Sequence, residues 1–235
     1  MSILGNSPAG RKAPILCYVT DRKCLAGPPR SQDELSQLVA KIAELVRAGV
    51  DWIQIREKDL TGKQLSSLTR DGLRESRAAR PAGEYCATRI LVNDRVDVAL
   101  AENADGVHLG ENGLPVAEVS QFVKRPSSPE GFLVGASCHS IEGARSAAAD
   151  RADYIVFGPI FATPSKAQFG QPQGVERLAE VCRKVSIPVV AIGGITLDNA
   201  DACVGAGAAG IAAIRLFQDS HDPAGFIRSL RALRR

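Results

Sequence analysis

The chain has 235 residues, of which 45% are hydrophobic, 23% charged and 5% aromatic, and 29 basic against 26 acidic side chains give a net charge of +3. This composition is typical of a globular protein and excludes an intrinsically disordered chain. The longest run without a charged or strongly polar side chain, residues 202–214, is too short for the ~18 residues that cross a bilayer.

Three further features bear on location and partners. Residues 1–10 lack the cationic and apolar regions of a signal peptide, so we expect a cytoplasmic protein without a membrane segment. The basic residues near the two ends lack interleaved aromatic side chains, which disfavours nucleic acid as a partner. The six cysteines contain no C-x-x-C pair, and we expect buried free thiols.

Strand and helix patterns alternate along the chain. Residues 1–13 are predicted to be a flexible tail, and residues 14–235 a single domain. Short apolar, β-branched runs predict strands at residues 14–20, 51–57, 88–94, 104–110, 132–139, 152–161, 187–194 and 208–214. Amphipathic segments predict helices at residues 31–49, 61–80, 96–102 and 174–184, at 197–205, and beginning near residues 115, 140 and 223.

The apolar strands show no polar alternation, which is expected when helices cover both faces of a parallel sheet. About eight βα units of about 29 residues each predict an α/β protein with a single (β/α)8 TIM barrel, an eight-stranded parallel barrel inside a ring of helices. A doubly wound open sheet is the alternative. The number of units and the lack of a compositionally distinct second segment favour the closed barrel.

In such a barrel the active site lies at the carboxyl ends of the strands. Gln54, Arg56 and Lys58 end the second strand at a spacing of two, so they project to one side and can bind an anion. The alternative is a surface ladder of salt bridges with Glu57 and Asp59.

The third strand ends in Asn93 and Asp94. The Asp94 carboxylate beside cations and a phosphate is a reasonable Mg²⁺ ligand. It is equally suited to capping the helix that follows. The sequence leaves both roles open.

A second polar cluster follows the sixth and seventh strands. Thr163, Ser165 and Lys166 suit phosphate oxygens, and Gly193 and Gly194 allow a ligand to approach the backbone. Two anion sites suggest two phosphorylated ligands, or one ligand with phosphates at both ends.

The fifth strand carries Ser137, Cys138 and His139. Strand alternation puts Ser137 and His139 on one face and Cys138 on the other, which disfavours a Cys–His nucleophilic pair. His139 is either a general acid or base or a hydrogen-bonded polar residue at the rim. For His108, at the end of the fourth strand, the hydrogen-bonded polar role is favoured.

Four segments resemble the thiamine phosphate synthase family: QIREKD at residues 54–59, LVNDRVDVALAENADGVHLG at 91–110, DYIVFGPIFATPSK at 153–166 and IPVVAIGGIT at 187–196. The resemblance covers residues 17–214. It implies a cytoplasmic transferase that joins an aminopyrimidine methyl diphosphate to a thiazole phosphate, with release of pyrophosphate. It also implies Mg²⁺ as cofactor and small molecules as the only ligands, while the oligomeric state, including a homo-oligomer, stays open.

The resemblance also assigns roles to individual residues. It implies that the pyrimidine diphosphate is held by Gln54, Arg56, Lys58, Asn93 and Lys166, with Ser137 near the pyrimidine and Asp94 on Mg²⁺. The thiazole phosphate would face Thr163, Ser165, Gly194 and Ile214. Catalysis would involve Arg56, Lys58, Ser137, His139 and Lys166, and the neighbouring Ile55, Glu57, Pro164 and Arg215 would complete the substrate pocket.

Two positions depart from the family pattern. Gly113 stands where a second metal-binding Asp is usual, and Glu111 is the candidate to replace it. Arg215 stands where a Ser is usual. These losses keep two alternatives open: a thiazole tautomerase with His139 as its base, and a barrel that binds thiamine precursors without turnover. Gln54, Arg56, Lys58 and Asp94 favour the synthase, because tautomerases tend to lose this set.

Overall fold

The computed structural model describes residues 13–25, 34–79, 88–124, 131–163 and 171–233. Its eight parallel strands form a closed barrel in chain order, with β1 paired to both β2 and β8. The strands are β1 (Ile15–Val19), β2 (Trp52–Ile55), β3 (Arg89–Asn93), β4 (Gly106–Leu109), β5 (Leu133–Cys138), β6 (Tyr154–Phe157), β7 (Val189–Ile192) and β8 (Gly210–Ala213). The predicted TIM barrel is confirmed, and the open sheet is excluded by the pairing of β1 with β8.

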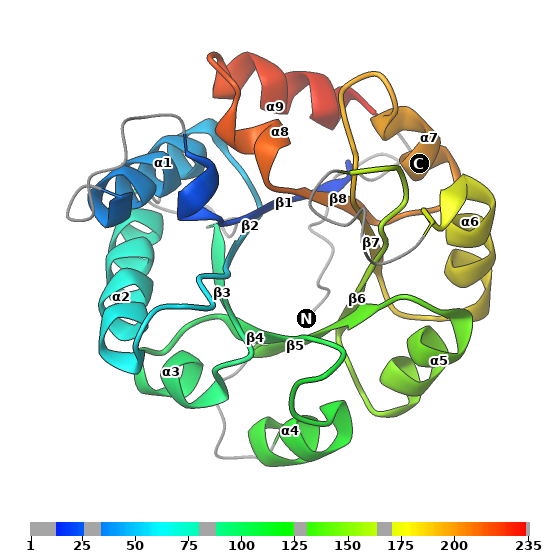
Figure 1. The fold of residues 1–235 in the computed structure, drawn as a ribbon, viewed down its shortest axis with the longest axis horizontal. Coiled ribbons are helices and arrows are strands. Elements are labelled where there is room, and N and C mark those ends of the chain that lie inside the picture. Colours follow the sequence, from blue (N-terminus) through cyan, green and yellow to red (C-terminus); the bar gives the residue numbers. More distant parts are fainter. Residues whose placement is uncertain (1–12, 26–33, 80–87, 125–130, 164–170, 234–235) are drawn as a thin grey trace.

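Helices surround the barrel (Figure 1). They are α1 (Glu34–Ala48), α2 (Gly62–Ala78), α3 (Val96–Ala101), α4 (Val116–Val123), α5 (Ile141–Ala149), α6 (Gly174–Lys184), α7 (Ala200–Gly205), α8 (Arg215–Gln218) and α9 (Pro223–Ala232). None of the helices in the described ranges is long and apolar enough to cross a membrane.

Two short elements were not expected from the sequence: the 3-10 helix η1 (Arg22–Cys24) after β1, and α8 after β8. Both are too short to show a helical repeat of apolar residues. The sixth strand ends at Phe157, four residues earlier than predicted. Pro159 follows Gly158, and a proline has no N–H to extend the sheet.

Apolar side chains fill two separate regions. The larger lies between the sheet and the helices, and a second cluster fills the barrel interior. Inside the barrel, Trp52 from β2 packs on Tyr154 from β6, with ring centroids 4.6 Å apart. Inward positions toward the carboxyl ends carry polar side chains instead, among them Gln54, Asn93, His108 and Ser137. The barrel interior is therefore filled by apolar side chains toward the amino ends of the strands and carries polar side chains toward their carboxyl ends.

The turns that enter β2, β4, β6 and β8 all contain a residue with positive φ, and three of the four carry an Asp two positions later. Gly49, Asn103, Arg151 and Gly207 all have positive φ, and the residues two positions later are Asp51, Asp105, Asp153 and Ala209. Each of the three carboxylates accepts a backbone N–H of the preceding strand at 2.8 Å, from Leu16, Ile90 and Val134 respectively. These contacts join neighbouring strands at the end of the barrel where the strands begin.

Replacing Asp105 by Ala tests the energetic contribution of these ties. The change leaves the Ile90 N–H without its acceptor. We expect the free energy of unfolding to fall by about 1–3 kcal/mol, the cost of an unpaired buried donor. Chemical denaturation measures it. Asp97→Ala, which removes an exposed carboxylate paired with Arg95, is the control and should change stability by less than about 0.5 kcal/mol. Equal effects of the two variants would contradict this account of the turns.

Candidate active site

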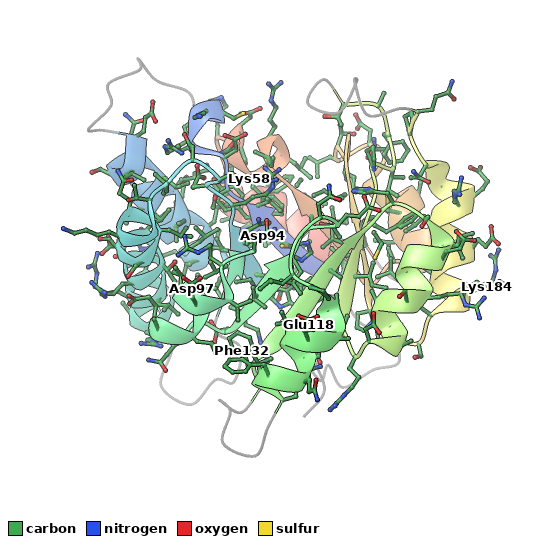
Figure 2. The ribbon with its side chains drawn as sticks, turned by 60° about the horizontal axis from the view of Figure 1, so that its bottom comes forward. Lys58, Asp94, Asp97, Glu118, Phe132 and Lys184 are labelled. Carbon is green, nitrogen blue, oxygen red and sulfur yellow. The ribbon has the colours of Figure 1, made fainter. Side chains whose placement is uncertain are left out.

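Polar side chains converge at the carboxyl ends of the strands. Figure 2 shows Lys58 and Asp94 toward one end of the barrel, whereas Phe132, which precedes β5, lies toward the other. Gln54, buried inside β2, donates from Nε2 to Asn93 Oδ1 at 2.8 Å. Asn93 Nδ2 in turn donates to Asp94 Oδ2 at 2.6 Å. The structure thus brings Gln54, Asn93 and Asp94 into one hydrogen-bonded chain.

The direction of this chain follows from its carboxylate. An ionised carboxylate only accepts hydrogen bonds, so Asn93 must turn its NH₂ toward Asp94 and its carbonyl toward Gln54. Gln54 is then the donor, and its own carbonyl oxygen remains as an acceptor at the barrel mouth. Residues from two strands therefore set the polarity of a buried amide.

Asp94 occupies a special backbone conformation. Its φ is +60°, and its Oδ1 accepts the Gly110 N–H at 2.7 Å. The N-cap position of α3 is occupied by Arg95, which makes no side-chain hydrogen bond to the helix. The capping role left open by the sequence is therefore wrong for Asp94. Its carboxylate instead faces the loop after β4, through the bond to Gly110.

Arg56 and Lys58 have no carboxylate partner within the described part of the chain. The predicted alternative, a ladder with Glu57 and Asp59, does not form, because Arg22 from η1 binds both acids. Arg22 Nη1 lies 2.9 Å from Glu57 Oε2 and 2.7 Å from Asp59 Oδ1. Sequence reasoning missed Arg22, since η1 shows no pattern and the contact spans 35 residues.

The acids around Arg22 are stabilised to different degrees. Hydrogen bonds from Arg22 and then Lys23 hold the pKa of Asp59 well below its usual value. Burial raises the pKa of Glu57, although bonds from Thr20 and Arg22 act in the opposite direction.

Strand alternation turns Ile55 away from the barrel interior, toward Gly72 of α2. The Ile55 and Glu57 side chains, both predicted to bind substrate, thus lie outside the polar cluster.

His108 and Ser137 form a second polar line. His108 Nε2 lies 2.9 Å from Ser137 Oγ, and Nδ1 lies 3.1 Å from the hydroxyl of Tyr154. Burial lowers the pKa of His108 to about 4, so the ring is neutral near pH 7. The prediction that His108 is a hydrogen-bonded polar residue is confirmed. Its link to Ser137 was not foreseen.

His139 and Glu111 meet at the edge of the site. His139 Nδ1 contacts the Gly158 carbonyl oxygen, and its Nε2 lies 3.8 Å from Glu111 Oε2. Cys138 is buried on the opposite face, and burial raises the pKa of its thiol to about 12, so it is no nucleophile at neutral pH. No group of three or more His, Cys, Asp or Glu side chains in the described ranges is arranged around a common metal position.

Several predicted residues of the second cluster are placed by the structure. Gly193 and Gly194 have φ of +101° and +64°, and Asn199 Nδ2 braces their turn through the Gly194 carbonyl at 2.9 Å. Ile214 packs against the barrel interior, and the exposed Arg215 lies beside Cys24. Thr163 is half-buried, while Pro164, Ser165 and Lys166 lie outside the described residues.

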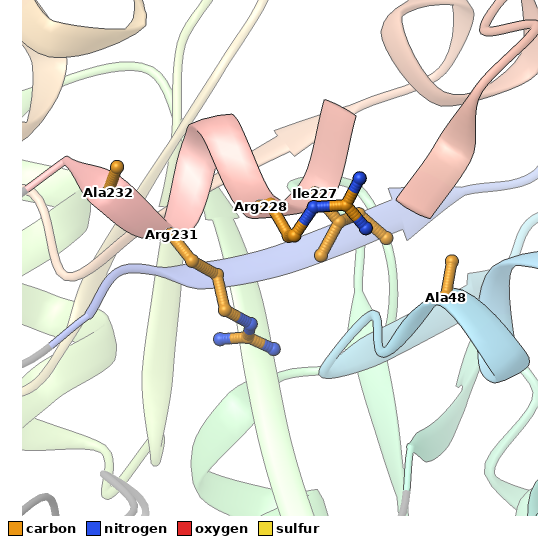
Figure 3. A pocket seen from close by; sticks show the side chains of 5 residues that line it. All are labelled: Ala48, Ile227, Arg228, Arg231 and Ala232. Atoms are coloured by element: carbon orange, nitrogen blue, oxygen red, sulfur yellow. The ribbon is translucent and has the colours of Figure 1, made fainter. Parts of the chain in front are cut away.

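Two surface hollows lie elsewhere. One, of about 460 Å³, is lined by Ala48, Ile227, Arg228, Arg231 and Ala232 from α1 and α9 (Figure 3). The other, of about 670 Å³, lies between α1 and α2. Neither includes a residue of the polar clusters, so the site is located by converging side chains rather than by the size of a hollow.

Comparison with known proteins shows the family of this chain. A family model described as thiamine monophosphate synthase matches residues 28–217. A thiamine-phosphate synthase of Methanoculleus marisnigri is 42% identical over 92% of this chain and 93% of its own. The chain belongs to the thiamine monophosphate synthase family.

A further sequence relative and a solved structure also match this chain. A thiamine-phosphate synthase of Chlorobium luteolum is 36% identical over 97% of this chain and 95% of its own. The solved structure of a thiamine phosphate pyrophosphorylase from Pyrococcus furiosus has a TM-score of 0.74 and 30% identity, covering 93% of this chain and 95% of that one. The match therefore includes the whole barrel of this thiamine monophosphate synthase family member.

The structure gives a physical setting for the departure at Gly113. The Gly113 N–H closes a turn onto the Gly110 carbonyl at 2.9 Å. A Cβ at position 113 would lie 2.9 Å from Asp94 Oδ1 and 3.1 Å from the Gly110 carbonyl oxygen. In this family member the turn is folded so closely onto Asp94 that a side chain at position 113 would crowd the Asp94 carboxylate and the Gly110 carbonyl.

Gly113→Ala tests this close packing. We expect the free energy of unfolding to fall by about 1–3 kcal/mol, because the added methyl group must displace the turn or Asp94. Gly205→Ala, at the end of α7 with nothing within 4 Å of the added Cβ, is the matched control and should not destabilise the protein. A Gly113→Ala protein as stable as the wild type would show that the turn is loose.

Proposed function

We propose that this protein joins an aminopyrimidine methyl diphosphate to a thiazole phosphate, forming thiamine phosphate and pyrophosphate. The proposal is carried by one observation: Arg56 and Lys58, which follow Gln54 of the hydrogen-bonded chain with Asn93 and Asp94 at the barrel mouth, have no carboxylate partner among the residues that the structure describes. Arg22 takes the neighbouring acids, so this rim is suited to an anionic ligand. Family membership supplies the class of reaction.

The reaction exchanges one bond for another. The thiazole nitrogen forms a bond to the exocyclic methylene carbon of the pyrimidine, and the bond from that carbon to the diphosphate oxygen breaks. The electron pair leaves with pyrophosphate, so negative charge grows on the departing oxygens. Arg56 and Lys58 would stabilise this charge, and fixed cations do so without reorganisation. The reaction needs no protein nucleophile, which is consistent with the inert Cys138.

The residues at the rim fit a Mg²⁺ ion. Mg²⁺ is bound by one or two carboxylates together with substrate phosphate oxygens and water. Asp94 offers such a carboxylate: each oxygen accepts one N–H and keeps a further lone pair. When bound, Mg²⁺ would neutralise charge on the diphosphate. Glu111 stays the proposed second ligand, and it would have to turn from His139 to reach the metal.

The second cluster would bind the thiazole phosphate. Gly194 supplies backbone at a turn with positive φ, where successive N–H groups suit anions. Ile214 supplies an apolar wall, and Thr163 and Arg215 polar groups. Ser165, Lys166 and Pro164 remain proposals for the same pocket.

One observation supports a second candidate, the thiazole tautomerase. The Gly158 carbonyl can only accept, so His139 holds its proton on Nδ1 and presents Nε2 as a base. Arg56 and Lys58, which follow β2 and have no carboxylate partner among the described residues, have no role in an isomerisation, and neither has the Asn93–Asp94 pair. We therefore favour the synthase.

A coupled experiment tests the proposal. The protein is incubated with the pyrimidine diphosphate, the thiazole phosphate and Mg²⁺, and thiamine phosphate is measured by chromatography. We expect product, and we expect Asp94→Ala to slow its formation by at least about 100-fold, as for loss of one charge-stabilising group. Asp97→Ala, three residues away and exposed, should leave the rate unchanged.

The contrary outcomes are distinct. No product under conditions where a reference synthase is active would refute the synthase, and proton exchange on the thiazole that depends on His139 would support the tautomerase. An undiminished rate in Asp94→Ala would refute the metal role of that residue alone.

A further inference from the structure

A line of buried hydrogen bonds reaches Ser137 from inside the barrel. Tyr154 on β6, His108 on β4 and Ser137 on β5 follow one another at 3.1 and 2.9 Å. Tyr154 and His108 are each only 1% exposed, whereas Ser137 is half-buried at the mouth. A purely structural role, in which the bonds only pair buried polar groups, explains why the bonds exist but not their direction.

The surroundings fix the tyrosine ring. The ring packs against that of Trp52, with centroids 4.6 Å apart and the two planes tilted by 55°. It also occupies the space beside Gly135, where a Cβ would collide with the ring and hydroxyl of Tyr154. A residue with a side chain at position 135 would push the hydroxyl away from His108. Three strands therefore combine to hold this hydroxyl against the imidazole.

The direction of the line follows from hydrogen-bond inventory. A buried tyrosine hydroxyl needs an acceptor for its proton, and within the described residues Tyr154 has no hydrogen-bond partner besides His108 Nδ1. Tyr154 therefore donates to Nδ1. A neutral imidazole carries one proton, which must then lie on Nε2 and be donated to Ser137 Oγ. Ser137, having accepted, directs its own proton into the mouth of the barrel.

We propose that Tyr154 and His108 are positioning residues that fix Ser137 as a hydrogen-bond donor to an unprotonated ring nitrogen of the heteroaromatic substrate. This inference rests on the proposed function for the identity of the ligand, but not for the direction of the line. Gln54 has the opposite polarity, because the Asp94–Asn93 pair leaves its carbonyl as an acceptor. An aminopyrimidine offers a ring nitrogen that accepts from Ser137 and an amino group that donates to the Gln54 carbonyl.

The direction is tested first without turnover. Nitrogen-15 NMR of the imidazoles at neutral pH distinguishes a protonated from an unprotonated ring nitrogen. The chain has three histidines, so the His108 signals are assigned by their loss in His108→Gln. We expect the proton of His108 on Nε2 in the wild type, and a mixture with the Nδ1 form in Tyr154→Phe, which removes the donor and keeps the ring. A wild-type proton on Nδ1 would overturn the proposal, whether or not the protein is a synthase.

Kinetics provide the second readout. We expect Tyr154→Phe to raise KM for the pyrimidine diphosphate about five- to tenfold, the effect of one weakened neutral hydrogen bond, with KM for the thiazole phosphate unchanged. His108→Gln keeps an acceptor and a donor and should retain more activity than His108→Leu, which keeps neither. Ser137→Ala should match the loss in His108→Leu, and its combination with Tyr154→Phe should add nothing. Additive losses, or equal activity of the Gln and Leu variants, would contradict a positioning role.

Discussion

The site depends on one guanidinium group. Arg22 binds Glu57 and Asp59, the two acids that alternate with Arg56 and Lys58 along the end of β2. Glu57 is almost fully buried, and a buried carboxylate without a partner would be costly. By binding both acids, Arg22 leaves Arg56 and Lys58 without a carboxylate partner among the described residues. The net charge of the segment is unchanged, but its arrangement in space becomes suitable for a diphosphate.

Two hydrogen-bonded lines add direction to this charge. One runs from Asp94 through Asn93 to Gln54, and the other from Tyr154 through His108 to Ser137. Each begins at a group that can act in only one sense: a carboxylate that accepts, or a buried hydroxyl that must donate. The first group sets which atoms of the following residues donate and which accept. The barrel therefore fixes the hydrogen-bond polarity of its mouth before any ligand binds. Such preorganisation lowers the cost of binding and reaction.

The sequence predicted the barrel because apolar strands and amphipathic helices repeat with a period that the fold imposes on the entire chain. It also located the polar cluster of Gln54, Asn93 and Asp94, since residues at the carboxyl ends of parallel strands meet at one end of the barrel. It could not exclude the role of Asp94 as a helix cap, because that depends on a backbone φ of +60° and on the bond from the Gly110 N–H to its carboxylate. It likewise missed Arg22 and the direction of the His108 line. These depend on contacts across strands, and no local pattern encodes them.

The most direct test of this account is calorimetric binding of pyrophosphate to the folded protein, comparing wild type with Arg22→Met. We predict at least about tenfold weaker binding, since Glu57 and Asp59 would turn to Arg56 and Lys58. The triple variant Arg22→Met, Glu57→Gln, Asp59→Asn should recover the affinity, because the competing acids are gone. Arg95→Met, which frees only the exposed Asp97, should bind like the wild type. Unchanged affinity in folded Arg22→Met would contradict the account, and so would a triple variant as weak as the single one.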